Sequence, residues 1–354
     1  MRAVTFYDGE GMREGTLTLR DGAPDLHWAP ELRWAPELVE GPAPAGTPRL
    51  DGVITGLFTD HHVHLQLVDT TLLAESRLGR VVDLGADPAW IAEVSDHDFG
   101  DSDPDDEAAA DLESVSADSR ERRRPIVRYA GPFLTAPGGY PSDRAWAPAG
   151  SVREIPDAEH AARTVDELAA AGVSLIKIVA HSDAGPVLDD DAFRAVVHQA
   201  AVHHLPVVAH AEGAGQAQRA VRLGATRLAH APFSERLSDA EIAAQAASAS
   251  WISTLAIHDG DTLALAIDNV RRFIAAGGEI LYGTDMGNGD APVDLRKTEI
   301  EALRAAGLDG LDLLASLSPA DPLASGPLLL LPDGDPNRAR RLTPADIDTD
   351  ITEP

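Results

Sequence analysis

The stretch Leu57-Phe-Thr-Asp-His-His-Val-His-Leu65 decides the fold prediction, because an apolar strand pattern in it contains closely spaced histidines. Alternation along a strand sends His62 and His64 to one face, where two imidazoles can share a metal ion. His61 is then expected to point the other way. A His-x-His pair taken alone is also compatible with half-buried strand histidines, so the prediction depends on what surrounds it.

Seven further apolar runs follow and alternate with Ala-rich amphipathic segments, which is the pattern of repeated βα units around a parallel sheet. The expected strands are Leu57–Leu65, Arg80–Leu84, Ile126–Ala130, Val173–Ala180, Pro206–His210, Thr226–His230, Trp251–Ala256 and Glu279–Tyr282. Helices are expected at Asp157–Ala171, Asp189–His204, Gly215–Leu223, Ser238–Ala249 and Thr262–Ala276. Eight units in about 260 residues predict an α/β fold built on a (β/α)8 TIM barrel. An open doubly wound sheet is the alternative.

The flanking segments have the features of a small β domain. Residues 1–55 contain short alternating runs and turns, and Pro327–Leu331 is an apolar run that fits one more strand. We therefore expect residues 1–55 and 325–354 to form a small, reduced β-sandwich domain beside a barrel of residues 56–324.

Two segments are interpreted as irregular. His27–Leu38, in which Trp-Ala-Pro-Glu-Leu occurs twice, is interpreted as a Pro-rich loop. An acidic insertion at about 95–124 is interpreted as a solvated excursion between the second and third strands. A lid over the barrel mouth is the alternative for this insertion.

The composition argues against several classes of partner. Asp and Glu number 58 against 29 Lys and Arg, and the net charge of -29 repels phosphate backbones and anionic membranes. No apolar stretch approaches the roughly 20 residues of a membrane helix, and Met1–Asp8 lacks a signal-peptide pattern. We expect a cytoplasmic protein that acts on a small molecule, without nucleic-acid or membrane partners; a homo-oligomer is compatible with the sequence. Because the chain has no cysteine, a metal must be held by nitrogen and oxygen donors.

Residues of the metal-binding types occur where other expected strands end. His210 and His230 each close an apolar run, and Asp285 follows Ile280-Leu-Tyr-Gly-Thr284. The carboxyl ends of barrel strands form the active-site face. Each residue alone is more often structural, but their joint occurrence at strand ends favours a metal site.

Lys177 is one of only two lysines and lies inside the apolar run Ser174–Ala180. An unpaired ammonium is costly to bury. Because the chain otherwise uses arginine for positive charge, a lysine here indicates a requirement that a guanidinium group cannot meet. An ammonium has no lone pair. Lys177 must therefore pair with a carboxylate such as Asp285, or lose its proton and be modified into an anionic ligand.

These motifs resemble the amidohydrolase superfamily, in the branch of imidazolonepropionase-like and prolidase-like proteins. The resemblance covers most of the chain and is carried by Asp60–His64, Val81–Gly85, Arg128–Gly139, Gly172–Ile178, Val208–Gly213, Gly224–His230 and Gly283–Asp285. It implies a metal-dependent hydrolase with a divalent ion, zinc by default.

The resemblance also implies how the site residues divide the work. The implied metal ligands are His62, His64, Lys177, His210, His230 and Asp285. One ion is assigned to the two histidines of the first strand with Asp285, and a second to His210 and His230, with a carboxylated Lys177 as the bridge. Asp285 is expected to take a proton from the bound water and pass it to the leaving nitrogen, so Asp285 and Lys177 are the catalytic candidates.

The predicted activity is hydrolysis of a C–N bond in an amide, a cyclic amide, an N-acyl amino acid or a dipeptide. One alternative, with a single ion and an unmodified Lys177, is a mononuclear deaminase or an imidazolone-type ring-opening hydrolase. Another is a catalytically silent amidohydrolase-like scaffold that only binds. Specificity resides in the βα loops, where the candidates for substrate contacts are Tyr140, Arg128, His181, His258 and Asn288.

Overall fold

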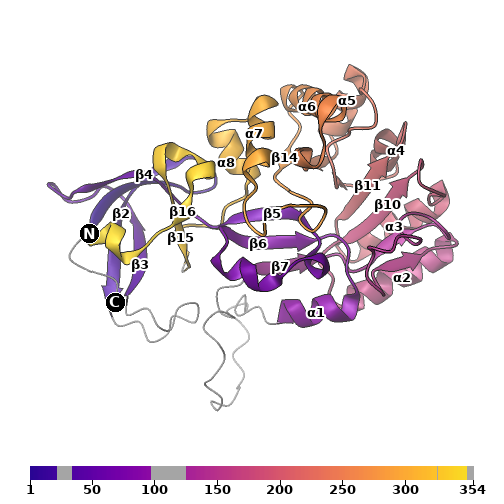
Figure 1. The fold of residues 1–354 in the computed structure, drawn as a ribbon, viewed down its shortest axis with the longest axis horizontal. Coiled ribbons are helices and arrows are strands. Elements are labelled where there is room, and N and C mark those ends of the chain that lie inside the picture. The colour runs from indigo at the N-terminus through magenta and orange to yellow at the C-terminus, as the bar shows by residue number, and fades with distance from the viewer. Residues whose placement is uncertain (22–33, 97–124, 325, 349–354) are drawn as a thin grey trace, which may run out of the picture.

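The computed structural model describes residues 1–21, 34–96, 125–324 and 326–348, and Figure 1 shows βα units along most of the chain with a separate sheet at one end. A three-stranded parallel sheet contains β5 (Phe58–Val63), β6 (Leu78–Asp83) and β7 (Ile126–Tyr129). A seven-stranded parallel sheet has the order β14-β13-β12-β11-β10-β8-β9. Its strands are β8 (Phe133–Thr135), β9 (Val152–Glu154), β10 (Ile176–His181), β11 (Val207–Glu212), β12 (Arg227–Leu228), β13 (Ser250–Ile252) and β14 (Ile280–Leu281). The predicted α/β class with parallel strands is confirmed.

Main-chain hydrogen bonds connect the two parallel sheets on both sides. Beside β7, the Ser174 amide donates to the Tyr129 carbonyl over 2.9 Å. Beyond β14, the His61 amide donates to the Tyr282 carbonyl over 3.0 Å, and Val63 forms a parallel bridge with Met286. Every predicted strand overlaps an observed one. The observed strands belong to two sheets, and the chain leaves strand conformation between β7, which matches the predicted third strand, and β8.

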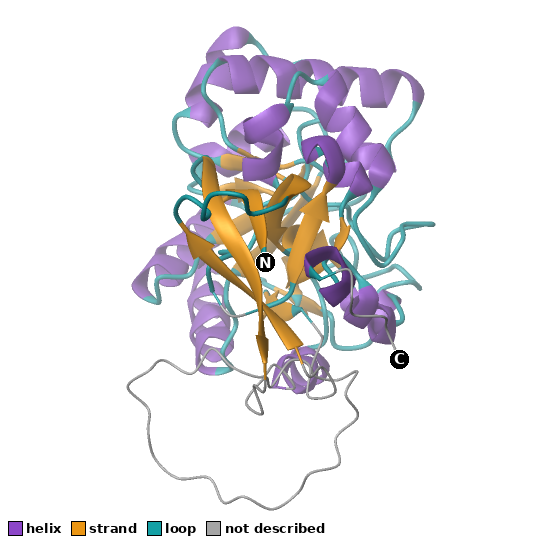
Figure 2. Cartoon of the chain, turned by 90° about the vertical axis from the view of Figure 1, so that its left-hand side faces the viewer, coloured by secondary structure: helices purple, strands orange, loops and turns teal. Residues whose placement is uncertain are grey.

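The helices follow the strands and cover the sheets (Figure 2). They are α1 (Pro88–Asp96), α2 (Ala158–Ala170), α3 (Asp190–Val202), α4 (Gln216–Arg222), α5 (Asp239–Ala246), α6 (Gly260–Ala275), α7 (Lys297–Ala305), α8 (Gly310–Ser316) and α9 (Pro344–Ile347). The five predicted helices correspond to α2 through α6. Side chains fix three starts: Asp157 accepts from the His160 amide, Asp189 caps α3, and Ser238 forms a capping box with Glu241. Within the described residues, no helix has the length and apolar character required to cross a membrane.

A small apolar cluster contains residues from successive βα units, and two of its members lie two residues before a predicted metal ligand in the sequence. It consists of Val82, Leu84, Ala130, Leu175, Val208, Ala229, Ile252 and Leu281. Val208 precedes His210 by two residues, and Leu175 precedes Lys177 by two. Because residues two apart share a strand face, the cluster forms an apolar layer on the faces that carry His210 and Lys177.

A six-stranded sheet combines both ends of the chain in the order β16-β15-β4-β1-β2-β3. Its strands are β1 (Arg2–Tyr7), β2 (Met12–Asp21), β3 (Trp34–Glu40), β4 (Arg49–Gly56), β15 (Leu328–Leu331) and β16 (Arg340–Arg341). The predicted strand near Pro327–Leu331 is present as β15, antiparallel to β4. These segments form one sheet in the part of the chain that the structure describes, so the sandwich itself is not confirmed. The boundaries at 55–56 and 324–325 stay a prediction.

The loop interpretation of His27–Leu38 is wrong for its second half. Trp34–Leu38 belongs to β3, which pairs with β2 and lies at an edge of the sheet. Pro36 is tolerated there because an edge strand has one side without ladder partners, where a missing N–H costs nothing. The first part of this segment, and the acidic insertion apart from its first two residues, lie outside the described residues.

Candidate metal centre and pocket

His62 of β5, His64 directly after this strand, and Asp285 form a three-donor group. Nε2 of His62 lies 3.0 Å from Oδ1 of Asp285, and Nε2 of His64 lies 3.1 Å from the same oxygen. The two Nε2 atoms are 3.2 Å apart, and all three side chains are buried. A tetrahedral ion with bonds of about 2.0–2.1 Å has neighbouring donors about 3.3 Å apart, so the group fits one divalent ion.

The buried Asp60 joins the two segments that supply the three-donor group. Its carboxylate accepts hydrogen bonds from the His62 amide (3.0 Å), the Thr284 amide (3.1 Å) and the Thr284 hydroxyl (2.6 Å). Burial raises the pKa of Asp60 to about 7, and the hydrogen bonds from Thr284 oppose that rise. Strand β5 is thereby fastened to the residue that precedes Asp285.

Asp285 itself has a left-handed backbone, with φ of 55°. Such a conformation is uncommon outside glycine, although Asp and Asn tolerate it better than other residues. It is held by neighbours on both sides: the His64 amide donates to the Met286 carbonyl over 2.7 Å, and Nδ2 of Asn288 donates to Oδ2 of Asp285 over 2.7 Å. Burial alone would raise the pKa of Asp285, but the adjacent imidazoles of His62 and His64 outweigh it and hold the pKa well below its usual value. The group is therefore a carboxylate.

His210 and His230 form a two-donor group. Nδ1 of His210 lies 3.0 Å from Nε2 of His230. The far nitrogen of each ring has a partner, because Nε2 of His210 lies 3.1 Å from Oε2 of Glu212 and Nδ1 of His230 lies 2.8 Å from Oγ1 of Thr254. A carboxylate only accepts, so Nε2 of His210 donates and its Nδ1 keeps a lone pair facing His230.

The imidazoles are in the form that ligates metal. Nδ1 of His62 donates to the Ala229 carbonyl over 2.8 Å, which leaves Nε2 with its lone pair toward Asp285. Burial lowers the pKa of His62 to about 4 and also lowers the pKa values of His210 and His230. Neutral imidazole is what a metal ion requires.

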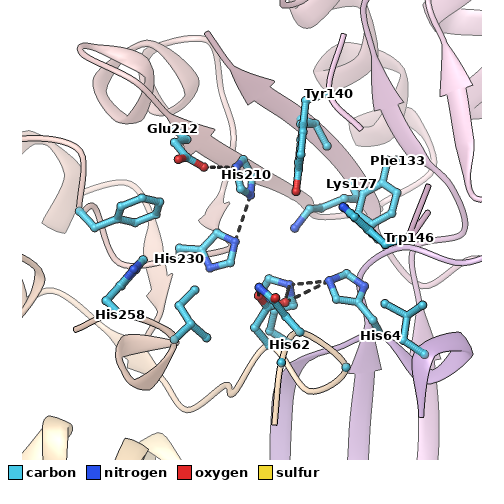
Figure 3. A pocket seen from close by; sticks show the side chains of 18 residues that line it. His62, His64, Phe133, Tyr140, Trp146, Lys177, His210, Glu212, His230 and His258 are labelled. Carbon is cyan, nitrogen blue, oxygen red and sulfur yellow. Dashed lines mark hydrogen bonds and ion pairs between the residues drawn. The ribbon is translucent and has the colours of Figure 1, made fainter. Parts of the chain in front are cut away.

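Lys177 reaches from β10 into the space between the two donor groups (Figure 3). Its side chain is 1% exposed. Burial lowers its pKa to about 7, against the opposing effect of the Asp285 and Asp83 carboxylates. A large fraction of the amine is therefore unprotonated at neutral pH, which an ordinary lysine is not.

A cavity of about 520 Å³ opens over the two donor groups. It is lined by His62, His64, Leu67, Phe133, Tyr140, Trp146, Lys177, Val179, His210, Glu212, His230, Phe233, Ile257, His258, Asp285, Gly287, Asn288 and Gly289. The structure thus brings all six predicted metal ligands together at one cavity.

The predicted substrate contacts divide into three classes. Tyr140, His258 and Asn288 line the cavity. His181 is not a lining residue, but its Nε2 lies 3.3 Å from Oε2 of Glu212 at the cavity wall. Arg128 is exposed on β7 between two buried residues and is not among the residues that line the cavity.

Several cavity residues escaped sequence reasoning. Glu212 could have been found, because it follows His210 by two residues and so shares its strand face. Phe133, Trp146 and Phe233 come from short strands and loops whose positions no periodic pattern specifies. Asp60 and Asp83 do not line the cavity, and their roles could not be predicted for another reason. Each carboxylate accepts hydrogen bonds from main-chain amides of distant or neighbouring residues, and no sequence spacing indicates such contacts.

Comparison with known proteins places the fold. No protein-family model and no curated protein matches the chain. Among solved structures, an amidohydrolase has a TM-score of 0.62 at 17% identity, covering 95% of this chain and 92% of that one. A Xaa-Pro dipeptidase with methionine bound in its active site has a TM-score of 0.61 at 14% identity, with coverage of 94% and 93%. Ochratoxinase of A. niger has a TM-score of 0.62 at 15% identity, with coverage of 93% and 90%. The chain therefore has the fold of amidohydrolases and prolidases.

Proposed function

We propose that this chain is a metal-dependent hydrolase of C–N bonds whose substrate is an amide, a cyclic amide, an N-acyl amino acid or a dipeptide. The observation that carries the proposal is the convergence of neutral imidazoles, a carboxylate and a buried lysine on one cavity, in a fold shared with an amidohydrolase and a Xaa-Pro dipeptidase. We also infer that eight of the parallel strands, β5, β6, β7, β10, β11, β12, β13 and β14, form one barrel, because hydrogen bonds connect the two parallel sheets on both sides.

The donor chemistry fits divalent zinc, which prefers nitrogen and carboxylate ligands. The three-donor group would hold one ion and the two-donor group a second. Ions so held lower the pKa of a bound water and polarise a carbonyl oxygen. Asp285 accepts a proton from the attacking water and returns it to the leaving nitrogen, which lets the C–N bond break without expelling an anion. Asn288, bonded to Oδ2 of Asp285, orients that carboxylate for the transfer.

Lys177 would complete the two-donor group after carboxylation. Its unprotonated amine attacks carbon dioxide, a new N–C bond forms and one proton leaves, which converts the amine into an anionic carbamate with two oxygen donors. Support comes from its position between the donor groups and its lowered pKa. A carbamate there would bridge two ions.

A single-ion enzyme is the second candidate, and one observation favours it. The three-donor group is complete without Lys177, so it can hold one ion beside an unmodified lysine. A mononuclear deaminase or an imidazolone-type ring-opening hydrolase would then fit the same cavity. A binding scaffold without activity is less well supported, because none of the six expected ligands has been replaced.

Metal analysis combined with a hydrolysis screen tests the proposal. The purified protein is expected to contain about two zinc ions per chain and to hydrolyse at least one of a set of N-acyl amino acids, dipeptides and cyclic amides. About one ion per chain with deaminase or ring-opening activity would favour the second candidate. The matched control is His198→Ala, which removes an exposed histidine of α3 and is expected to change neither measurement. Absence of both bound metal and hydrolysis would refute the proposed function.

A further inference from the structure

The charges around the cavity are unbalanced. Asp285 and Glu212 are its carboxylates, whereas Lys177 is the sole lysine or arginine among the lining residues that the structure describes. Lys177 is buried between the donor groups and interacts with Asp285 and Asp83. Asp285 belongs to the three-donor group, so Glu212 is the lining carboxylate that is left for a substrate cation.

Glu212 is placed to contact a ligand. It ends β11, lines the cavity and keeps 29% of its side chain exposed. Oε2 lies 3.1 Å from Nε2 of His210 and 3.3 Å from Nε2 of His181, so that oxygen is fixed between two imidazoles. The other oxygen has no hydrogen-bond partner among the residues described, and a carboxylate has lone pairs there for further donors.

Aromatic rings stand beside the two imidazoles that hold this carboxylate. The Tyr140 ring lies 5.0 Å from the His181 ring and 5.9 Å from the His210 ring, measured between centroids. Trp146 extends the same wall, with its ring 6.0 Å from that of Tyr140. The Arg144 guanidinium lies over the Tyr140 ring, 5.5 Å from its centroid, so an ion pair with Glu212 is the attraction that this wall offers to an ammonium group.

The distance from Glu212 to the reaction centre suggests where the ammonium belongs in the substrate. Glu212 contacts one nitrogen of the His210 ring, and the other nitrogen of that ring faces His230. The width of one imidazole ring therefore separates the Glu212 carboxylate from the donor atoms of the two-donor group. A group bound by Glu212 therefore lies close to the bond being cleaved, as the α-ammonium of an amino acid lies close to its own carbonyl.

We propose that the cavity selects amides of amino acids with a free α-ammonium group, and that Glu212 binds this group. The proposal rests on the proposed C–N hydrolase function and names the acyl side of its substrate. No carboxylate is required on the leaving side.

Four chromogenic substrates with the same leaving group test the charge preference. L-leucine p-nitroanilide carries the ammonium, its N,N-dimethyl derivative keeps the charge with added bulk, its N-acetyl derivative is neutral, and its N-succinyl derivative is anionic. We expect kcat/KM to be highest for the two cations, about tenfold lower for the acetyl compound and lowest for the succinyl compound. Equal values across the four, or the reverse order, would overturn the proposal.

The isosteric Glu212→Gln variant assigns the preference to this residue. The amide oxygen can still accept the His210 hydrogen bond, so the donor nitrogen stays oriented, and the variant is expected to lose the preference for the cations mainly through a higher KM. If it lowered kcat for cationic and neutral substrates equally, Glu212 would merely position His210 and the proposal would be wrong.

A binding measurement separates this proposal from the proposed function. In leucinol and N-acetylleucinol a primary alcohol replaces the leucyl carbonyl and its scissile amide, and calorimetry on the metal-loaded protein is expected to show about tenfold tighter binding of leucinol. Glu212→Gln should abolish that difference. Failure to hydrolyse any substrate would count against the hydrolase, whereas equal affinity for the two alcohols would count against the role of Glu212.

Discussion

The two donor groups differ in what holds them. The three-donor group is fixed by main-chain bonds: Asp60 fastens β5 to Thr284, the His64 amide binds the Met286 carbonyl, and His62 donates to the Ala229 carbonyl. In the two-donor group the rings are held by side chains, Glu212 on that of His210 and Thr254 on that of His230. The difference teaches that the first group has the donors and the anchoring to hold an ion by itself, whereas the second would need a further ligand, which we propose is Lys177.

Asp285→Asn is the change with the largest expected effect, because it removes both a donor of the three-donor group and the proton acceptor. We expect kcat to fall on the order of 10²- to 10⁴-fold, the usual contribution of a general acid–base residue. Steady-state kinetics and metal analysis of the same preparation measure it. Full hydrolytic activity of this variant would disprove the mechanism given above.

Lys177→Met removes the group that is proposed to complete the two-donor group. The bound metal is expected to fall from about two ions to about one per chain, since the three-donor group does not need Lys177, and activity should fall about 100-fold. Lys297→Met is the matched control: it changes the other lysine, whose side chain is 73% exposed. Loss of both ions together would show that the two groups are not independent.

Asp60→Asn tests the anchoring of the three-donor group. An asparagine has the same shape, and its oxygen can still accept from the two main-chain amides, but its NH2 group replaces the oxygen that accepts from the Thr284 hydroxyl, so that hydrogen bond is lost or must reverse. We expect the affinity for the first ion to fall about 10- to 100-fold, with a smaller change at the second. Titration with a competing chelator, followed as two release steps, measures each affinity separately. An unchanged affinity for the first ion would show that Asp60 does not anchor the three-donor group.

The smallest expected effect is that of added salt. Because both donor groups are buried, added salt is expected to leave metal stoichiometry unchanged. The net charge of -29, in contrast, destabilises the folded chain through repulsion between acids, and salt screens it. Melting temperature should therefore rise in about 1 M KCl, by about 2–4 °C for each kcal/mol gained. A melting temperature that falls with salt would mean that attractive ion pairs outweigh the repulsion.

The strand pattern and the donors could be predicted from sequence because both depend on local periodicity. His62 and His64 share a face two residues apart, and His210 ends an apolar run, so their direction follows from alternation. Lys177 stood out because lysine is rare in this chain. The same reasoning identified β15, because four consecutive leucines form a strand of their own.

What could not be predicted depends on contacts between distant parts of the chain. Asp60 meets Thr284 across most of the barrel sequence, and Phe233 meets His258 with ring centroids 4.2 Å apart although both are in loops or helix ends. Arg128 does not line the cavity; the resemblance located its strand but not its depth along the strand relative to the cavity. Pro36 was read as a loop signal, since the sequence does not reveal that its strand lies at an edge.

The antiparallel pairing of β4 with β15 has a consequence for how the protein is made. Gly56 pairs with Leu328 and Val53 with Leu331, so β4 cannot form this pairing until β15, far along the chain, has been synthesised. On the ribosome, β4 is therefore exposed along one side while almost all the rest is synthesised, and an unpaired strand edge attracts other chains. Closing so long a loop is slow, although its entropic cost grows only slowly with length. A ribosome that stalls before Leu328 would release a chain whose βα units are all present but whose β4 edge is bare, and we expect such chains to aggregate during translation.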